Sequence, residues 1–459
     1  MSEKVEGHEA HMQKAENLGI LPAVRRPIKI VFLGAGSAFF RKLFVDVMSI
    51  PGADTGEMAL VDIDEERLEL QHRIAEMIVG KMGKRWTVSA SADRRKVLAD
   101  ADYVINCIEV SGLQCVRHDN DIPTKYGVEQ CIGDTIGPGG LFKALRTVPV
   151  FLEVLKDIEE LCPNAWILNY TNPMSIMCLA SARTSRANLV GLCHSVQGTS
   201  HALARYADVP YAEMRWSCGG INHLAWFTEL RHNGEDLYPA LRQKVQNDSE
   251  LYEQDVVRFD MMQHFGYFIT ESSGHLSEYL PYYRKRPELM KKYCREGYRG
   301  GSSFYADGWP KWRADRDAMH RKILAGEEDI SLDRTWEYAS YIIQAMETHE
   351  PITIYGTVHN TGLIENLPQD GVVEVACMID RNGVHPTHFG PLPGQCAAVC
   401  DWNMRMYDLA ATACIEKSRE AAVHALMLDP LTAAVCCPAE IKQMFDELFE
   451  AEREFLPGF

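Results

Sequence analysis

The chain has 459 residues, of which 46% are hydrophobic and 24% charged, an ordinary composition for a folded protein long enough to form two packed lobes. Its formal net charge of −17 argues against nucleic acid or an anionic membrane surface as a partner. No apolar run approaches the roughly 20 residues that span a bilayer. Residues 1–26 are polar and charged, so we expect an N-terminal arm or oligomer contact rather than a signal sequence.

Short apolar runs alternate with helical stretches over residues 27–200. This βαβα pattern predicts an α/β fold, a Rossmann-type doubly wound parallel sheet, in which ligands collect at the carboxyl ends of the strands. The expected strands are Ile28–Leu33, Met58–Val61, Tyr103–Cys107, Trp166–Leu168 and Leu189–Cys193. Between them, Glu65–Val79 and Lys143–Leu161 have the amphipathic pattern of helices.

A glycine-rich turn follows the first expected strand. Gly34 and Gly36, with Ser37 after them, let a backbone approach a pyrophosphate at the start of a helix. Asp62 ends the second strand, where a carboxylate grips the ribose hydroxyls of NAD and repels the extra phosphate of NADP. The residue at position 39 is phenylalanine, so the glycine fingerprint is incomplete. A tight strand-to-helix turn is the structural alternative, but the strand and Asp62 together favour NAD binding.

Two later loops have both a structural and a functional interpretation. The loop before the second long helix contains Gly139 and precedes Arg146; it is either a stiff helix entry or a floor under the nicotinamide and sugar. Asn172, in Asn-Tyr-Thr-Asn-Pro, follows a buried strand. Asparagine and proline are typical of turns, but side-chain amides at a strand end also suit vicinal hydroxyls.

Cys193 and His223 are candidates for a metal site. Cys193 ends the fifth expected strand, and His223 lies in the strand-like Gly-Ile-Asn-His-Leu-Ala-Trp segment. A thiolate and an imidazole meeting at a crevice would bind a borderline divalent metal and leave positions open for substrate oxygens. A lone histidine on an apolar strand is more often a core residue, so both interpretations stay open. The other 13 cysteines are scattered without CxxC pairs, as free thiols in a reducing cytoplasm would be.

Beyond residue 200 the pattern loosens. Trp216–Glu229 and Val372–Ile379 are expected strands, whereas residues 250–348 and 397–459 are mainly helical. Residues 201–459 are therefore expected to form a mixed α+β lobe that covers the mouth of the first and carries substrate, metal and oligomer contacts. An aromatic cluster in this lobe contains Tyr279. Core packing explains such a cluster, but a tyrosine whose pKa a cation lowers can also act as a general base.

These motifs, in this order, resemble glycoside hydrolase family 4 over nearly the whole chain. The matching segments are Gly-Ala-Gly-Ser, Gly-Pro-Gly-Gly, Asn-Tyr-Thr-Asn-Pro-Met, Gly-Ile-Asn-His and Asn-Leu-Pro. Within the family, Cys-His-Ser-Val-Gln-Gly-Thr and Thr-Glu-Ser-Ser closely resemble the bacterial α-galactosidase (melibiase) branch. The resemblance implies a dehydrogenase-like architecture of the lactate and malate type, and cytoplasmic dimers or tetramers.

The resemblance also implies a chemistry in which NAD is a cofactor rather than a co-substrate. NAD takes hydride from C3 of the sugar, a base removes the acidified C2 proton, and the bond from C1 to the leaving group breaks by elimination. Water adds at C1, and the stored hydride reduces C3 again. A divalent metal, usually manganese, binds the C2 and C3 oxygens.

Carried over by motif, the family's roles fall on residues already singled out. Cys193 and His223 match the metal ligands, Asn172 matches a substrate-binding asparagine, and Tyr279 matches the proposed base at C2. His194 stands where phosphosugar-specific members have an aspartate that acts as general acid. Glu109 stands near a strand end where many members have arginine. A carboxylate there would repel a 6-phosphate or uronate, so we predict a neutral sugar.

Two alternatives remain open. A member of the same family could act on α-glucuronides, α-galacturonides or sulfosugars instead of α-galactosides. A plain NAD-dependent dehydrogenase of a sugar or hydroxy acid would instead release stoichiometric NADH. The predicted partners are therefore a small-molecule α-glycoside and a second copy of the chain.

Overall fold

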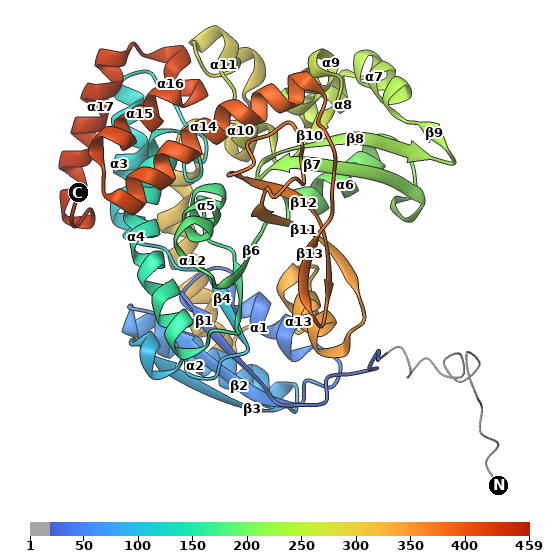
Figure 1. Ribbon diagram of the computed structural model, residues 1–459, viewed down its shortest axis with the longest axis vertical. Coiled ribbons are helices and arrows are strands. Elements are labelled where there is room, and N and C mark those ends of the chain that lie inside the picture. Colours follow the sequence, from blue (N-terminus) through green and yellow to red (C-terminus); the bar gives the residue numbers. More distant parts are fainter. Residues whose placement is uncertain (1–18) are drawn as a thin grey trace.

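The computed structural model describes residues 19–459, and one continuous sheet runs through that part of the chain (Figure 1). Its order is β10-β8-β7-β12-β11-β6-β5-β4-β1-β2-β3, with β13 beside β12 and β9 beside β8. The parallel half contains β1 (Ile28–Leu33), β2 (Thr55–Val61), β3 (Arg85–Ser91), β4 (Tyr103–Asn106), β5 (Trp166–Asn169) and β6 (Asn188–Leu192). The antiparallel half contains β7 (Met214–Ile221), β8 (Leu224–His232), β9 (Glu235–Asp236), β10 (Phe268–Ile269), β11 (Ile352–His359), β12 (Val372–Asp380) and β13 (Gly383–Pro386).

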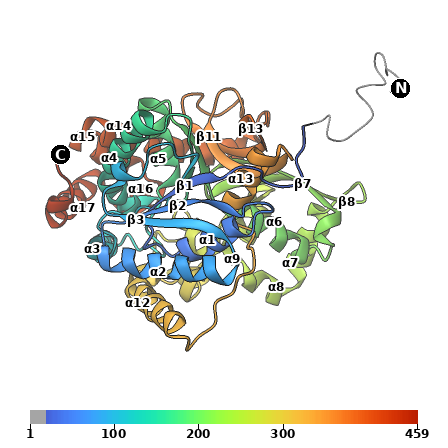
Figure 2. The same cartoon turned by 90° about the horizontal axis from the view of Figure 1, so that it is seen from below.

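Helices cover both faces of the parallel half. In Figure 2, α4 and α5 lie on one face of β1–β3 and α1 and α2 on the other, as in a doubly wound sheet. The helices of the first 210 residues are α1 (Phe40–Met48), α2 (Glu65–Lys81), α3 (Gly112–Lys125), α4 (Gly137–Leu161), α5 (Met174–Thr184) and α6 (Ser195–Tyr206). The predicted Rossmann-type α/β class is therefore confirmed.

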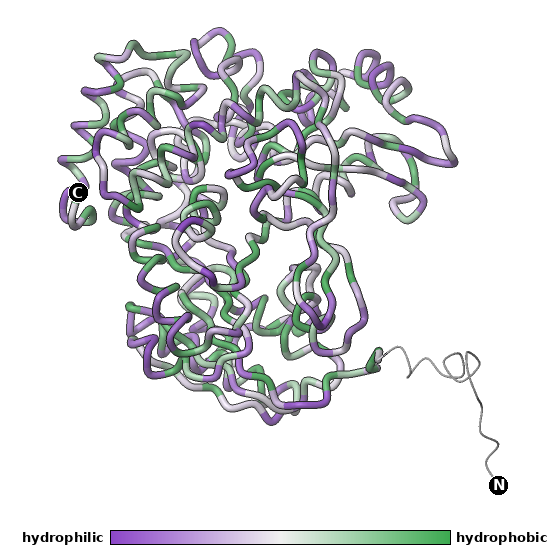
Figure 3. Tube along the Cα trace, in the orientation of Figure 1, coloured by the Kyte–Doolittle hydropathy of each residue, from purple (hydrophilic) through white to green (hydrophobic). Residues whose placement is uncertain are grey.

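The later helices add a second set of layers. They are α7 (Tyr238–Asn247), α8 (Ser249–Gln254), α9 (Val256–Phe265), α10 (Ser273–Leu276), α11 (Pro287–Tyr293), α12 (Phe304–Ala325), α13 (Tyr338–Thr348), α14 (Gly394–Glu416), α15 (Arg419–Leu428), α16 (Pro430–Val435) and α17 (Pro438–Ala451). Helix α14 packs back on α4 and α5, and α12 packs on α2 and α3. The C-terminal half thus helps to enclose the first. The outer helix α17 alternates between hydrophobic and hydrophilic residues, with its apolar side buried (Figure 3).

All five expected strands of the first half are present, and the differences have physical causes. Strand β3 was not predicted, because it is an edge strand whose side chains are mostly exposed or half-buried and so lacks a continuous apolar run. Residues 216–229 are a hairpin of β7 and β8 rather than one strand, because Asn222 and His223 form a two-residue turn. Strand β11 was also not predicted; it pairs with both β6 and β12 and so joins the two halves of the sheet.

The predicted N-terminal arm, residues 1–26, lies outside the described residues up to position 18. Its remainder lies against the body of the protein. The Leu21 N–H donates to the Thr348 carbonyl over 2.7 Å, and Arg26 pairs with Asp102 at 2.7 Å. None of the helices formed by residues 19–459 has the length and hydropathy needed to traverse a lipid bilayer.

Candidate active site

Three side chains from distant parts of the chain form a group that could hold a metal ion. Cys193 directly follows β6, His223 forms the turn between β7 and β8, and Glu271 follows β10. The Cys193 Sγ lies 3.4 Å from His223 Nε2, which is 3.5 Å from Glu271 Oε2. One ligand atom of each residue lies within 4.8 Å of the other two. One sulfur, one nitrogen and one oxygen donor suit a borderline divalent cation and leave coordination positions open.

Backbone geometry explains how these side chains meet. His223 and Glu271 both adopt left-handed conformations, with φ of 65° and 73°. Such values are uncommon for residues other than glycine, and they cluster at functional sites. The continuous sheet places the ends of β6 and β7 near one another through β11 and β12, which lie between them.

The environment of the triad is strongly charged and largely buried. Burial opposes ionisation of Glu271, but His223 and His275 outweigh it and hold the pKa of its carboxyl at about 2. The Tyr298 hydroxyl also donates to Glu271 over 2.9 Å. Burial, followed by the Glu271 charge, raises the pKa of the Cys193 thiol to about 11. A bound cation would reverse this effect, because a coordinating thiol is deprotonated.

Tyr279 lies directly behind the histidine of this triad. Its hydroxyl is 2.9 Å from His223 Nδ1, and the side chain is fully buried. Burial, reinforced by Tyr407 and Asp134, raises the pKa of the Tyr279 phenol well above its usual value. Without a cation nearby, Tyr279 therefore holds its proton firmly. The lowered pKa expected of a catalytic tyrosine requires a compensating positive charge.

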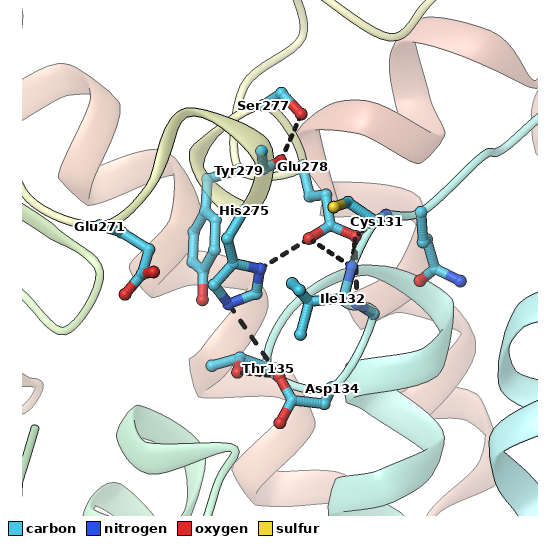
Figure 4. Close-up of polar contacts among 12 residues, drawn as sticks. Cys131, Ile132, Asp134, Thr135, Glu271, His275, Ser277, Glu278 and Tyr279 are labelled. Carbon is cyan, nitrogen blue, oxygen red and sulfur yellow. Dashed lines mark hydrogen bonds and ion pairs between the residues drawn. The ribbon is translucent and has the colours of Figure 1, made fainter. Parts of the chain in front are cut away.

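A second polar cluster adjoins the triad (Figure 4). His275 Nδ1 lies 2.6 Å from Glu278 Oε2, and its ring is 4.9 Å from that of His223. Glu278 accepts hydrogen bonds from the backbone N–H groups of Cys131, Ile132 and Gly133 over 2.7–3.1 Å. His275 Nε2 faces Asp134 Oδ1 at 4.0 Å. No site role was predicted for Glu271, His275 or Glu278, although Glu271 belongs to the Thr-Glu-Ser-Ser motif and Glu278 directly precedes Tyr279.

Glu109 is paired with a cation, which the sequence did not indicate. Its Oε2 lies 2.9 Å from Lys143 Nζ, which is also 3.4 Å from Asp134 Oδ2. These three groups line one small pocket with Tyr305 and Trp309. Two carboxyl groups face one ammonium; burial raises the pKa of Glu109 against the opposing charge of Lys143, so the cluster has a net negative charge when both carboxyls are ionised. Burial would raise the pKa of Asp134, but Lys143 and His275 hold it at about 2, so this carboxyl is ionised.

Arg146 borders the same pocket but is engaged elsewhere. Its guanidinium makes two hydrogen bonds to Asp119, at 2.7 and 3.0 Å, and a third to Glu452. The side chain is 1% exposed. The structure therefore gives Arg146 a packing role between α3, α4 and the C-terminal segment, and contact with a substrate stays a prediction.

The glycine-rich turn lies at the carboxyl ends of β1 and β2. Gly34 has a φ of 80°, and a Cβ there would come within 2.4 Å of the Cys107 carbonyl oxygen. The Gly36 N–H donates to Asp62 Oδ2 over 2.7 Å, and Ser37 Oγ is buried without a partner. Only a glycine fits at position 34, because the backbone there lies directly against the neighbouring strand end.

The remaining predicted residues lie around these clusters. Gly139 sits inside the turn that starts α4; its N–H donates to Gln130 over 3.1 Å, and a Cβ would clash with Gly133. Asn172 precedes a cis-proline at the end of β5 and is half-buried. His194 is 54% exposed, with Nδ1 3.7 Å from Glu337. The structure thus joins Cys193, His223 and Tyr279 by direct contacts, whereas the other predicted residues are not part of that group.

Comparison with known proteins agrees with this architecture and these motifs. Residues 29–209 match the family described as family 4 glycosyl hydrolase, and residues 218–432 match its C-terminal domain. The chain therefore belongs to glycosyl hydrolase family 4, as its motifs had indicated.

Individual relatives are informative about the branch. The chain is 38% identical to an α-galactosidase of Bacillus subtilis, over 94% of this chain and 99% of the relative. It is 36% identical to an α-galactosidase of Rhizobium meliloti, over 94% and 89% of the two chains. A crystal structure of the 6-phospho-β-glucosidase of Thermotoga maritima with manganese, NAD⁺ and glucose 6-phosphate superposes with a TM-score of 0.77. That pair is 23% identical and covers 93% and 99% of the two chains, which supports the fold.

Proposed function

We propose that this glycoside hydrolase cleaves small α-galactosides with NAD and a divalent metal, Mn²⁺, as cofactors. The observation that carries the proposal is the triad of Cys193, His223 and Glu271 on the same sheet as a dinucleotide-binding turn. The relatives named α-galactosidase support the sugar, and the NAD⁺ and manganese of the Thermotoga maritima structure support the cofactors. We also propose a cytoplasmic homodimer or homotetramer, in keeping with 14 free cysteines.

The donor atoms of the triad suit the divalent metal, and the backbone of the glycine-rich turn suits NAD. Cys193, His223 and Glu271 would hold the cation, and Gly34, Gly36 and Ser37 would lie along the pyrophosphate, with Asp62 at the ribose. When bound, NAD supplies a reversible hydride acceptor and the metal a Lewis acid for two sugar oxygens. The loop containing Gly139 would support the nicotinamide from below, and Asn172 would bind sugar hydroxyls.

The chain's own residues would move the protons of the reaction. Hydride would leave C3 and the O3–H proton would pass to solvent, which acidifies the C2 proton for transfer to an ionised Tyr279; the electrons of the C2–H bond would then expel the leaving group from C1. His194, exposed and beside Glu337, would protonate the leaving oxygen. Water would then add at C1 and give a proton back to His194, Tyr279 would return its proton to C2, and hydride and a solvent proton would return to C3 and O3. The net reaction is hydrolysis with no consumption of NAD.

Dependence on both cofactors is the first testable prediction. Enzyme stripped of NAD and chelated should lose hydrolysis of 4-nitrophenyl α-galactoside, and NAD, Mn²⁺ and a thiol reductant together should restore it. Absorbance at the NADH band should stay constant during turnover, and the product formed in D₂O should carry deuterium at C2. Full activity of the stripped enzyme would contradict the proposal, and one NADH per turnover would indicate a plain dehydrogenase.

The substituent at C6 of the sugar gives a second prediction. The cluster of Glu109, Asp134 and Lys143 carries two carboxylates and one ammonium, so it should disfavour an anion. Among α-glycosides that differ only at C6, we expect kcat/KM to be higher for the hydroxymethyl compound than for the uronate, sulfonate or phosphate. Preference for an anionic C6 would instead favour the galacturonidase or sulfosugar alternative.

A further inference from the structure

Helix α12 belongs to the C-terminal half of the chain but packs on α2 and α3 of the first half (Figure 2). Its Arg313 Nη2 lies 3.1 Å from Asp64 Oδ2. One turn later, Asp317 Oδ1 lies 2.8 Å from Arg67 Nη2. Arg67 borders the glycine-rich turn, since its Nη1 would lie 3.3 Å from a Cβ at Gly36. This stretch of α12 therefore lies within the reach of a side chain from the turn that is assigned to the pyrophosphate.

Arg316, on the same stretch of α12, has no counter-ion. Its side chain is half-buried, and its Nε is buried without a partner. Among residues 19–459, it forms no ion pair and donates no hydrogen bond, although the arginines on either side of it along the helix face are paired. Burial, followed by the charge of Arg67, lowers the pKa of the Arg316 guanidinium. Because arginine stays protonated in proteins, the fold holds this cation in place at a cost in stability.

Arg41 is a second half-buried cation of the same kind. It lies in the first turn of α1, directly after the glycine-rich turn. Its side chain has no ion-pair or hydrogen-bond partner in the part of the chain that the structure describes, and burial lowers the pKa of its guanidinium. Burial, followed by the charges of Arg41 and Arg316, lowers the pKa of the His320 imidazole to about 4. The two cations therefore lie near one buried ring, which they keep neutral.

The nearby carboxylates are already engaged. Asp64 and Asp317 belong to the two ion pairs of α12, and Asp62 accepts the N–H groups of Gly36 and Asp64 over 2.7 and 3.0 Å. Half-buried charges are normally paired, so two of them without a partner indicate an anionic ligand. A dinucleotide pyrophosphate carries two negative charges and binds where a glycine-rich turn enters a helix. The planar fork of arginine matches phosphate oxygens in pairs.

We propose that Arg41 and Arg316 bind the pyrophosphate of NAD, so that helix α12 closes the cofactor site from the C-terminal half of the chain. The proposal rests on the cofactor of the proposed function and adds two binding side chains to the backbone of the turn. Each arginine supplies one positive charge to a ligand with two negative charges. The ion pair of Asp317 with Arg67 holds this part of α12 in place before the cofactor arrives, so little ordering is needed on binding.

Cofactor binding tests the proposal without turnover. NADH is titrated by its fluorescence into enzyme stripped of NAD, and ADP-ribose and adenosine, with and without the pyrophosphate, serve as competitors. We expect Arg316→Gln to bind NADH and ADP-ribose about tenfold to a hundredfold more weakly, and adenosine within about twofold of wild type. Arg316→Lys keeps the charge without the fork and should recover part of the loss. Arg321→Gln, on the same helix and paired with the exposed Glu66, is the matched control.

Thermal stability provides a readout that a packing role would move in the opposite direction. Without cofactor, Arg316→Gln should melt at the wild-type temperature or above it, because a cation without a partner is removed. A fixed concentration of NADH should raise its melting temperature less than that of the wild type. Unchanged NADH affinity, or equal losses for ADP-ribose and adenosine, would overturn the proposal.

A second variant guards against a folding failure. If Arg316→Gln fails to fold, Arg41→Gln is judged by the same criteria. Failure of the proposed function would appear separately, as a wild type that binds NADH but does not hydrolyse α-galactosides.

Discussion

Replacing Cys193 by serine should lower kcat/KM for an α-galactoside by roughly a thousandfold, the largest loss that we expect from a single substitution. Cys193 contributes the sulfur of the triad, 3.4 Å from His223 Nε2. A serine hydroxyl keeps the shape but is a poor ligand for a borderline cation at neutral pH. Loss of a Lewis acid that stabilises developing charge costs several kcal/mol, and about 4 kcal/mol corresponds to this factor.

Mn²⁺ titration by calorimetry, alongside steady-state kinetics, distinguishes a loss of metal binding from a loss of folding stability. The variant should bind Mn²⁺ at least about tenfold more weakly and keep the melting temperature of the metal-free wild type. Cys437→Ser is the matched control, because Cys437 is exposed at the start of α17, where serine is a preferred cap. If Cys193→Ser kept the Mn²⁺ affinity and the activity of the wild type, the triad would not be the catalytic metal site.

Local patterns predicted the first half of the fold because buried parallel strands are continuous apolar runs. Five of the six strands of the parallel half were found this way, with their polar carboxyl ends. The edge strand β3 and the connecting strand β11 were missed. Strand β3 lacks burial, and β11 is a strand because β6 and β12 flank it, which is long-range information that no local pattern contains.

Only part of the site was predicted, because local patterns reveal some of its residues and long-range contacts bring in the others. Cys193 and His223 stood out because each ends or interrupts a strand, and the sheet then brings them into contact. Glu271 lies in the irregular segment between β10 and α10, and His275 lies in the short helix α10, so only the tertiary fold brings the two residues to the triad. The ion pair of Glu109 was not predicted, because its partner, Lys143, lies 34 positions away on α4.

Replacing Arg146 by leucine should lower the free energy of unfolding by about 3–5 kcal/mol, because it removes one partner of a buried ion pair. Arg146 joins Asp119 of α3 to Glu452 beyond α17, with two hydrogen bonds to Asp119 at 2.7 and 3.0 Å. Burial, followed by the charge of Asp119, raises the pKa of Glu452. The variant would leave the Asp119 carboxylate buried without its counter-ion.

Chemical denaturation of the full chain measures this loss, and kinetics on the remaining folded enzyme separates it from catalysis. The control is Arg117→Leu, on α3 and 44% exposed, where the pairs with Asp121 and Asp307 should contribute only about 0.2–1 kcal/mol. For folded Arg146→Leu, KM for the α-galactoside should stay within about threefold of wild type, because both terminal nitrogens of the guanidinium are already engaged by Asp119 and Glu452. An unchanged free energy of unfolding together with a large rise in KM would instead indicate that Arg146 contacts the substrate. Its position in α4, after the loop that contains Gly139, had suggested this role.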